Sequence, residues 1–140
     1  MNWQKKNFTI SSEHERVDID ALYDMLRRSH WAKDRTREEV EQTVANSICF
    51  SLFDGEEQIG FARVLTDRVA YAVILDMIIR DDFRGQGLGK WLMRCIFEHP
   101  EISALRQVLW TTDADNFYKK LGFQEMSKIK FMARSWKISA

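Results

Sequence analysis

A strongly apolar segment that runs into a glycine-rich loop and then into an amphipathic helix is the feature that most constrains this chain. Residues 69–80 contain few polar side chains, which is typical of a central strand buried on both faces. The glycine-rich residues 84–89 (Arg-Gly-Gln-Gly-Leu-Gly) follow. Apolar residues then recur at helical spacing over 88–96, and Pro100 marks the end of the helix. The sequence therefore predicts a buried strand, a glycine loop and a helix in direct succession.

A glycine loop in front of a helix favours an anion-binding site. Glycine lets the backbone turn sharply and approach a ligand closely. The first helical turn offers free N–H groups and a partial positive charge, and successive loop amides can surround an anion. Trp91 excludes the Walker A motif, and Lys90 stands where the dinucleotide fingerprint requires its last glycine. The remaining pattern is R-x-x-G-x-G, for which a helix entry without a ligand is the alternative.

The other segments predict an α+β chain, with a central mixed sheet (α/β mixed) flanked by helices. The helix-forming segments show helical spacing of apolar residues, and the strands carry apolar runs between turn signals. A capping box formed by Thr36 and Glu39 starts the second helix. The expected order is β-α-α-β-β-β-α-β-α-β. Its elements are a strand at 7–12, a helix from Asp18 or Asp20, a loop at 29–35, a helix from 36, strands at 48–53, 58–66 and 69–80, a helix at 88–96, a strand at 108–111, a helix capped by Asp113 and running through Leu121, and one or two strands in 123–138.

Length and composition narrow the class of protein. The 140 residues predict one domain over 1–140, and 45% of them are hydrophobic, which suffices for a core. Lys+Arg and Asp+Glu number 21 each, so the net charge of zero argues against a nucleic-acid binder. The three histidines and two cysteines show no metal-ligand spacing. No apolar run approaches the length of a membrane span. We expect a cytoplasmic protein with no metal, no membrane partner and no nucleic-acid partner.

Two motifs, taken together, resemble those of the GNAT N-acetyltransferase superfamily. Arg84-x-x-Gly87-x-Gly89 is similar to its acetyl-CoA motif, and residues 113–123 (DADNFYKKLGF) are similar to its A-x-x-x-Y-x-x-x-G-F signature. The expected element order also agrees. The resemblance implies an acetyl-CoA-dependent N-acetyltransferase acting on a primary amine of a small molecule or protein, as a monomer or homodimer. A non-catalytic acetyl-CoA or CoA sensor is the alternative, and the acyl group is either acetyl or longer.

The resemblance also implies where acetyl-CoA binds. In this family the donor lies where two parallel strands splay apart, with the pantetheine arm along the end of the central strand and the pyrophosphate on the glycine loop. A backbone N–H of that strand would polarise the thioester carbonyl. Thr111 stands where the family often has asparagine. The expected cofactor-binding residues are Met77, Ile78, Ile79, Arg84, Gly85, Gln86, Gly87, Leu88, Gly89 and Thr111.

The resemblance implies that Tyr118 is the general acid for the departing CoA thiolate. A phenol has a pKa of about 10 and a thiol about 8.5, so the proton transfer is mildly uphill and needs good geometry. The alternative is that Tyr118 only packs on the sheet. Asp76 interrupts the apolar strand, so it is the candidate base or water-relay anchor for the acceptor amine. Its alternative role is an ion pair with Arg63.

Acceptor selectivity is expected to come from the loop before the second helix and from the strand at 58–66. Trp31 is the one large aromatic residue in a polar loop, and it is expected either to wall the acceptor pocket or to anchor the loop in the core. An arginine in the pocket would favour an acidic group on the substrate. The candidate acceptor-binding residues are Trp31, Arg35, Phe61 and Arg63.

Overall fold

The computed structural model describes residues 1–136 and separates the chain into two compact units. The first is Met1–Leu109, and the second is Trp110–Ala140, described up to residue 136.

The first unit is built on a six-stranded mixed sheet, which confirms the α+β class. Its strands lie in sequence order, and all neighbours are antiparallel except the last pair, β5 and β6, which are parallel. The strands are β1 (Asn2–Lys5), β2 (Phe8–Ser11), β3 (Ile48–Asp54), β4 (Glu57–Thr66), β5 (Tyr71–Ile79) and β6 (Arg106–Val108).

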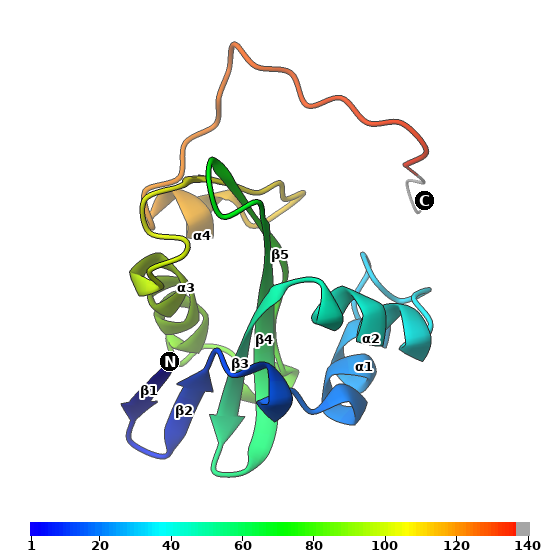
Figure 1. Ribbon diagram of the computed structural model, residues 1–140, viewed down its shortest axis with the longest axis vertical. Helices are drawn as coiled ribbons and strands as arrows, with labels where there is room; N and C mark the ends of the chain where they lie inside the picture. Colours follow the sequence, from blue (N-terminus) through cyan, green and yellow to red (C-terminus); the bar gives the residue numbers. More distant parts are fainter. Residues whose placement is uncertain (137–140) are drawn as a thin grey trace. The chain divides into compact units, whose positions relative to one another are not determined.

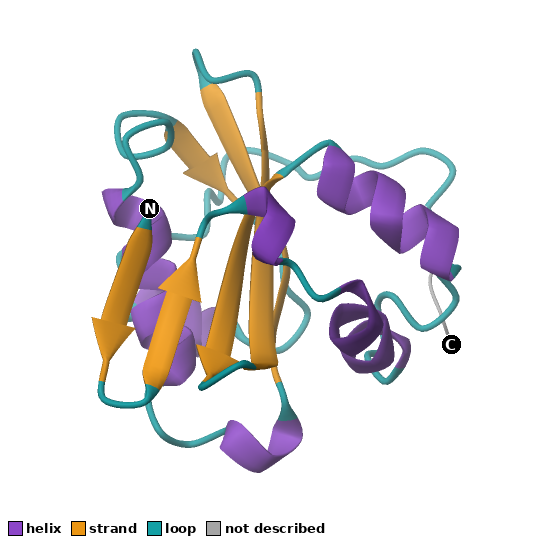
Figure 2. Cartoon of the chain, turned by 60° about the horizontal axis from the view of Figure 1, so that its bottom comes forward, coloured by secondary structure: helices purple, strands orange, loops and turns teal. Residues whose placement is uncertain are grey.

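Three helices cover this sheet, with α1 and α2 on one face and α3 on the other (Figures 1 and 2). They are α1 (Ile19–Arg27), α2 (Arg37–Ala45) and α3 (Leu88–Glu98), and single 3-10 turns lie at His14–Arg16 and Asp81–Phe83. Asp18 caps α1 by accepting from the N–H of Ala21, and the Thr36–Glu39 capping box starts α2 as predicted. These caps fix the two ends of the loop that joins α1 to α2.

The apolar stripes of α1 and α2 pack against the central strands. Leu22 and Leu26 of α1 join Val40 of α2, Phe61 of β4 and Ile78 of β5 in one buried cluster. Burying an aliphatic or aromatic side chain contributes about 1.5–3 kcal/mol, so this cluster holds the two helices on the sheet. It also brings the α1–α2 loop close to the middle of β4 and β5.

A β-bulge interrupts β5 at Asp76. The pairing runs Phe61↔Ile78 and then Arg63↔Leu75, so two residues of β5 oppose one of β4. Asp76 has φ +53°, in the left-handed region that a non-glycine residue seldom adopts. A bulge of this kind bends the strand and re-aims side chains at the point where the sheet is otherwise most regular.

The strand predicted at 7–12 is confirmed as β2, but its hairpin partner β1, which precedes the turn at Lys6 with φ +56°, was not predicted. The apolar Trp3 lies on a short, mostly exposed strand, which is why no run of hydrophobic residues indicated β1. The strand predicted next to β5 was wrong in extent. The strand expected at 108–111 lies at Arg106–Val108, because it pairs in parallel with Tyr71–Val73 of β5.

The second unit departs further from the predictions. Its helix α4 is Asp115–Lys119, and the hydroxyl of Thr111, not Asp113, accepts from the backbone N–H of Ala114 at its start. Residues 123–136 form no strand, so the prediction of one or two strands in 123–138 was wrong for this part; 137–138 lie outside the described residues. Apolar composition makes a strand only where a second backbone edge pairs with it.

Candidate functional site

The two parallel strands β5 and β6 of the first unit pair over three residues only. They pair only from Tyr71↔Arg106 to Val73↔Val108. β6 then ends, whereas β5 continues to Ile79. Within the described chain, residues 74–79 of β5 therefore have no strand partner on that edge. The backbone groups that face this edge are available to an extended ligand, as an added strand would use them, although the carbonyl of Ile79 accepts from Arg84. Met77, Ile78 and Ile79, which the sequence predicts to bind the donor, lie on this stretch.

The glycine loop and the first turn of α3 form an uncapped helix N-terminus. Gly87 is the N-cap residue, with φ +80°, and no side chain caps the helix. Gly85 has φ +84°, and a Cβ placed on either glycine would meet no heavy atom within 4 Å. The space in front of these residues is thus open, and the amides of the first turn point into it. This arrangement fits the phosphate groups of a nucleotide-containing cofactor.

Arg84 ties this loop to the end of β5. Its Nε donates to the carbonyl oxygen of Ile79 at 3.1 Å, and its Nη2 lies 3.1 Å from Asp81. Gln86 donates its side-chain amide to the carbonyl of Phe83 at 3.4 Å. The loop side chains therefore brace the loop, and the backbone is left to face a ligand.

Four of the predicted site residues form one hydrogen-bonded cluster around Asp76 of β5. The carboxylate of Asp76 accepts from Trp31 Nε1 at 3.0 Å, from Arg35 Nη1 at 2.5 Å and from Arg63 Nε at 2.7 Å. Trp31 and Arg35 come from the α1–α2 loop, and Arg63 comes from β4. The ion pair between Asp76 and Arg63 that the sequence suggested is present, and Arg35 adds a second.

Both oxygens of Asp76 are thus engaged, and its side chain is only 2% exposed. Burial alone would raise the pKa of Asp76, but the hydrogen bond and charge of Arg35, with those of Arg63, outweigh burial and lower the pKa below its ordinary value. A carboxylate held in this way is a weak proton acceptor. The geometry favours the ion-pair role of Asp76 over that of the base.

Trp31 takes neither of its two expected positions completely. The residue is 44% exposed, so it is not an anchor in the core, yet its indole N–H donates to Asp76. Phe61 is fully buried among the residues beneath α1. The structure therefore does not bring Phe61 to a surface that a substrate can reach.

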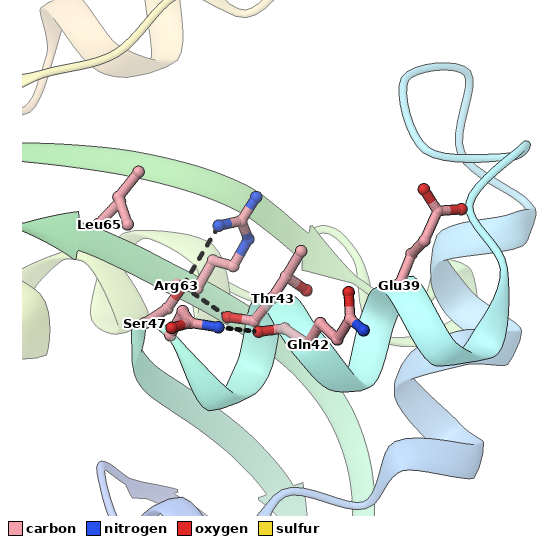
Figure 3. A pocket seen from close by; sticks show the side chains of 7 residues that line it. Glu39, Gln42, Thr43, Ser47, Arg63 and Leu65 are labelled. Atoms are coloured by element: carbon pink, nitrogen blue, oxygen red, sulfur yellow. Dashed lines mark hydrogen bonds between the residues drawn. The ribbon is translucent and has the colours of Figure 1, made fainter.

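A polar pocket of about 310 Å³ lies beside this cluster, between α2 and β4 (Figure 3). Arg63 joins the pocket to Asp76, and it also donates Nη1 to the hydroxyl of Ser47 at 3.2 Å. The lining residues are Glu39, Gln42, Thr43, Asn46, Ser47, Arg63 and Leu65. Sequence reasoning missed the α2 residues, although Gln42 and Asn46 are four apart and so share one face of the predicted helix.

The second unit carries the remaining predicted residues. Tyr118 is half-buried in α4, with ring contacts to Phe117 and Phe123. Burial raises the pKa of its phenol, so the hydroxyl keeps its proton at neutral pH. Thr111 is exposed and uses its oxygen at the start of α4.

Residues 1–136 contain neither a cluster of metal-ligating side chains nor a membrane-spanning helix. No three His, Cys, Asp or Glu side chains there are grouped so as to hold a metal ion. None of the helices described is long and apolar enough to cross a membrane.

A mixed sheet whose parallel pair is short, followed by a glycine loop at a helix N-terminus, is typical of α+β folds that bind a nucleotide-containing cofactor. Comparison with known proteins makes this specific. Residues 45–125 match the family model described as an acetyltransferase (GNAT) domain. The chain belongs to the GNAT acetyltransferase family, and its class of enzyme is N-acetyltransferase.

Relatives and solved structures agree with this assignment. The uncharacterized N-acetyltransferase ycf52 of Pyropia yezoensis is 33% identical over 124 residues, which cover 80% of this chain and 68% of the relative. That of Gracilaria tenuistipitata var. liui is 35% identical over 113 residues, covering 76% and 60%. A crystal structure from Xanthomonas campestris pv. campestris, of a protein assigned to the GNAT family, superposes with a TM-score of 0.86 at 30% identity, covering 92% of this chain and 93% of that one.

Proposed function

We propose that the protein transfers an acetyl group from acetyl-CoA to the primary amine of a small molecule, with Tyr118 as general acid. The observation that carries the proposal is that the unpaired edge of β5 is followed by a glycine loop at an uncapped helix N-terminus. Together they would provide backbone hydrogen bonds for an extended arm and an anion site for a pyrophosphate. Enzymes of this family use acetyl-CoA as donor.

The donor would be held mainly by backbone groups. Residues 77–79 would bind the arm, and the amides of residues 85–89 would bind the phosphates. Bound there, acetyl-CoA would supply an acetyl thioester. A backbone N–H of β5 beside the thioester carbonyl would stabilise negative charge on its oxygen, because such donors are fixed before the reaction.

The protonation steps would be divided between a tyrosine and solvent. The Tyr118 hydroxyl stays protonated at neutral pH and can give its proton to a thiolate. The acceptor amine must lose a proton, and Asp76 is not free to take it directly, since two arginines and Trp31 occupy its oxygens. We assign Asp76 the role of positioning Arg35 and Arg63, with water as the proton acceptor.

Calorimetric titration with acetyl-CoA tests the donor site. We expect saturable binding near one per chain, lost in Gly87→Asn. Asparagine tolerates a left-handed backbone, so its side chain fills the open space without unfolding the loop. Gly55→Asn is the matched control, because Gly55 also has positive φ (+60°) and open space but lies in the β3–β4 turn. Equal affinity in the two variants would overturn the assignment of the glycine loop.

Release of free thiol from acetyl-CoA in the presence of amines tests the catalytic step. Tyr118→Phe should lower turnover at least about tenfold with acetyl-CoA affinity unchanged, since a positioned acid contributes roughly 10²–10⁴. Tyr23→Phe in α1 is the control for loss of a hydroxyl elsewhere. Unchanged turnover in Tyr118→Phe would remove Tyr118 from the mechanism.

A further inference from the structure

We propose that the pocket between α2 and β4 is the acceptor subsite and that it selects amines carrying an anionic group, a carboxylate or a phosphate. The inference rests on the proposed function and adds the chemical class of the acceptor. It is carried by Arg63, which lines the pocket together with polar side chains of α2 (Figure 3).

Arg63 is held so that part of its guanidinium group is free for a ligand. Its Nε donates to Asp76, and its Nη1 donates to Ser47. Its Nη2 has no acceptor among the described residues. The side chain is only 10% exposed, so a ligand bound there is screened little by solvent. A guanidinium fixed on two sides loses little entropy on binding an anion.

The charges around the pocket leave Arg63 attractive to an anion. Asp76 neutralises one positive charge, but it faces two arginines, Arg35 and Arg63. Glu39 is the acidic residue of the pocket wall. It is exposed, and its carboxylate accepts from the backbone N–H of Thr36 at the N-terminus of α2, where the helix dipole offsets its charge. Arg63 is thus the cationic residue of the lining, and the group of Arg35, Asp76 and Arg63 to which it belongs carries one net positive charge.

The wall contributed by α2 can complete the recognition. Gln42 makes no side-chain hydrogen bond within the described chain, so its amide can donate to an anionic oxygen. The Nδ2 of Asn46 donates to the carbonyl oxygen of Gln42, so its Oδ1 is left to accept from a donor on the ligand. These amides accept and donate without adding charge. They fit an amino-acid-like molecule better than a simple alkylamine.

The pocket lies close to the proposed donor site, because Arg63 and the donor-binding stretch of β5 are on neighbouring strands. Arg63 pairs with Leu75 of β5, one residue before Asp76 and two before Met77. Neighbouring strands are about 4.8 Å apart, and one residue along a strand adds about 3.3 Å. A molecule whose anionic group sits on Arg63 can thus place an amine a few bonds away at the bulged part of β5.

Matched amine pairs, which differ only by the anionic group, test the proposal. The pairs are lysine and cadaverine, ornithine and putrescine, 4-aminobutyrate and propylamine, and phosphoethanolamine and ethanolamine. The kcat/KM for thiol release should favour the anionic member by about tenfold, as one charge-assisted hydrogen bond would give. Comparing the preference within the phosphate pair with that within the carboxylate pairs shows which anionic group the pocket binds.

The variant for this test is Gln42→Glu. Arg63→Gln is unsuitable, because it would remove a partner of the buried Asp76 carboxylate and destabilise the fold. A new negative charge in the pocket should reduce the preference for anionic amines about fivefold. Gln4→Glu in β1 makes the same change of net charge away from the pocket and should leave the preference intact. Equal use of both members of each pair, or a preference unaffected by Gln42→Glu, overturns the proposal.

Direct binding separates this proposal from the proposed function. If no amine releases thiol, the proposed function fails, and the same pairs are titrated while backbone amide NMR signals of α2 are followed. Shifts in α2 with the anionic amines, weakened in Gln42→Glu, support the pocket as an anion site. An absence of such shifts overturns it.

Discussion

Replacing Asp76 with asparagine should be among the most destabilising conservative changes in this protein. Asparagine has the same size and tolerates positive φ, so the bulge in β5 can persist and the change removes mainly charge. Breaking a buried ion pair costs about 3–5 kcal/mol, because the remaining charge is left uncompensated. Arg35 is 26% exposed and can turn to solvent, whereas Arg63 cannot. We therefore expect a loss of about 3 kcal/mol, at the lower end of that range.

Urea denaturation at neutral pH measures this loss as a change in midpoint at constant slope. The control is Asp24→Asn, whose carboxylate pairs with Arg27 and Arg28 at 3.3 and 3.4 Å but is 46% exposed. Exposed pairs contribute about 0–1 kcal/mol, so the control should be nearly neutral. A loss below about 1 kcal/mol in Asp76→Asn would refute the argument that the arginines depend on this carboxylate.

The same comparison has a defined pH dependence. The folded protein lowers the pKa of Asp76, so its stabilisation is complete above the unfolded value of about 3.9 and is lost as pH falls through the folded value. The difference between wild type and Asp76→Asn should be constant from about pH 5 to 8 and shrink below about pH 4. A difference that grows on acidification would contradict this sign.

Three further outcomes are expected. Gly60→Ala should lower stability by about 1–3 kcal/mol in urea denaturation, since its Cβ would lie 2.9 Å from a side-chain carbon of Leu52. Thr36→Ala should cost about 1 kcal/mol in the same assay and reduce helical circular dichroism on heating, because the capping box is lost. Burial raises the pKa of both cysteine thiols, Cys49 and Cys95, to about 12, so the native protein should react with a disulfide reagent at pH 8 far more slowly than the urea-unfolded protein. Fast reaction of the native protein would show that the thiols are accessible.

The sequence could predict those parts of the fold whose signals are local. The buried strand, the glycine loop and α3 were predicted together because apolar run, glycines and helical spacing occupy adjacent residues. The capping box of Thr36 was readable for the same reason. The hairpin of β1 and β2 was not, since its strands are only four residues each and depend on pairing across the sheet.

The members of the Asp76 cluster were predicted from the sequence but their arrangement was not, and the α2 residues of the pocket were missed. Spacing singled out Asp76 as a polar residue in an apolar strand, and it named Arg63 as a possible partner. It could not show that the strand bulges at Asp76, because a bulge depends on the register between two strands. Nor could it show that Trp31 and Arg35 close on the same carboxylate from a loop about 40 residues away in sequence.

In this proposal, the bulge at Asp76 connects the acceptor half and the donor half of the candidate site, because both depend on β5. On one side of β5, Asp76 binds Arg35 of the α1–α2 loop and Arg63, and Arg63 lines the proposed acceptor pocket. On its open edge, the next residues of the same strand would hold the donor. A residue that would position both substrates under this proposal benefits from being rigid, because small errors in the approach of the reacting groups cost much of the rate. The strained φ of Asp76, held by three hydrogen bonds, is the expected cost of such rigidity at a functional position.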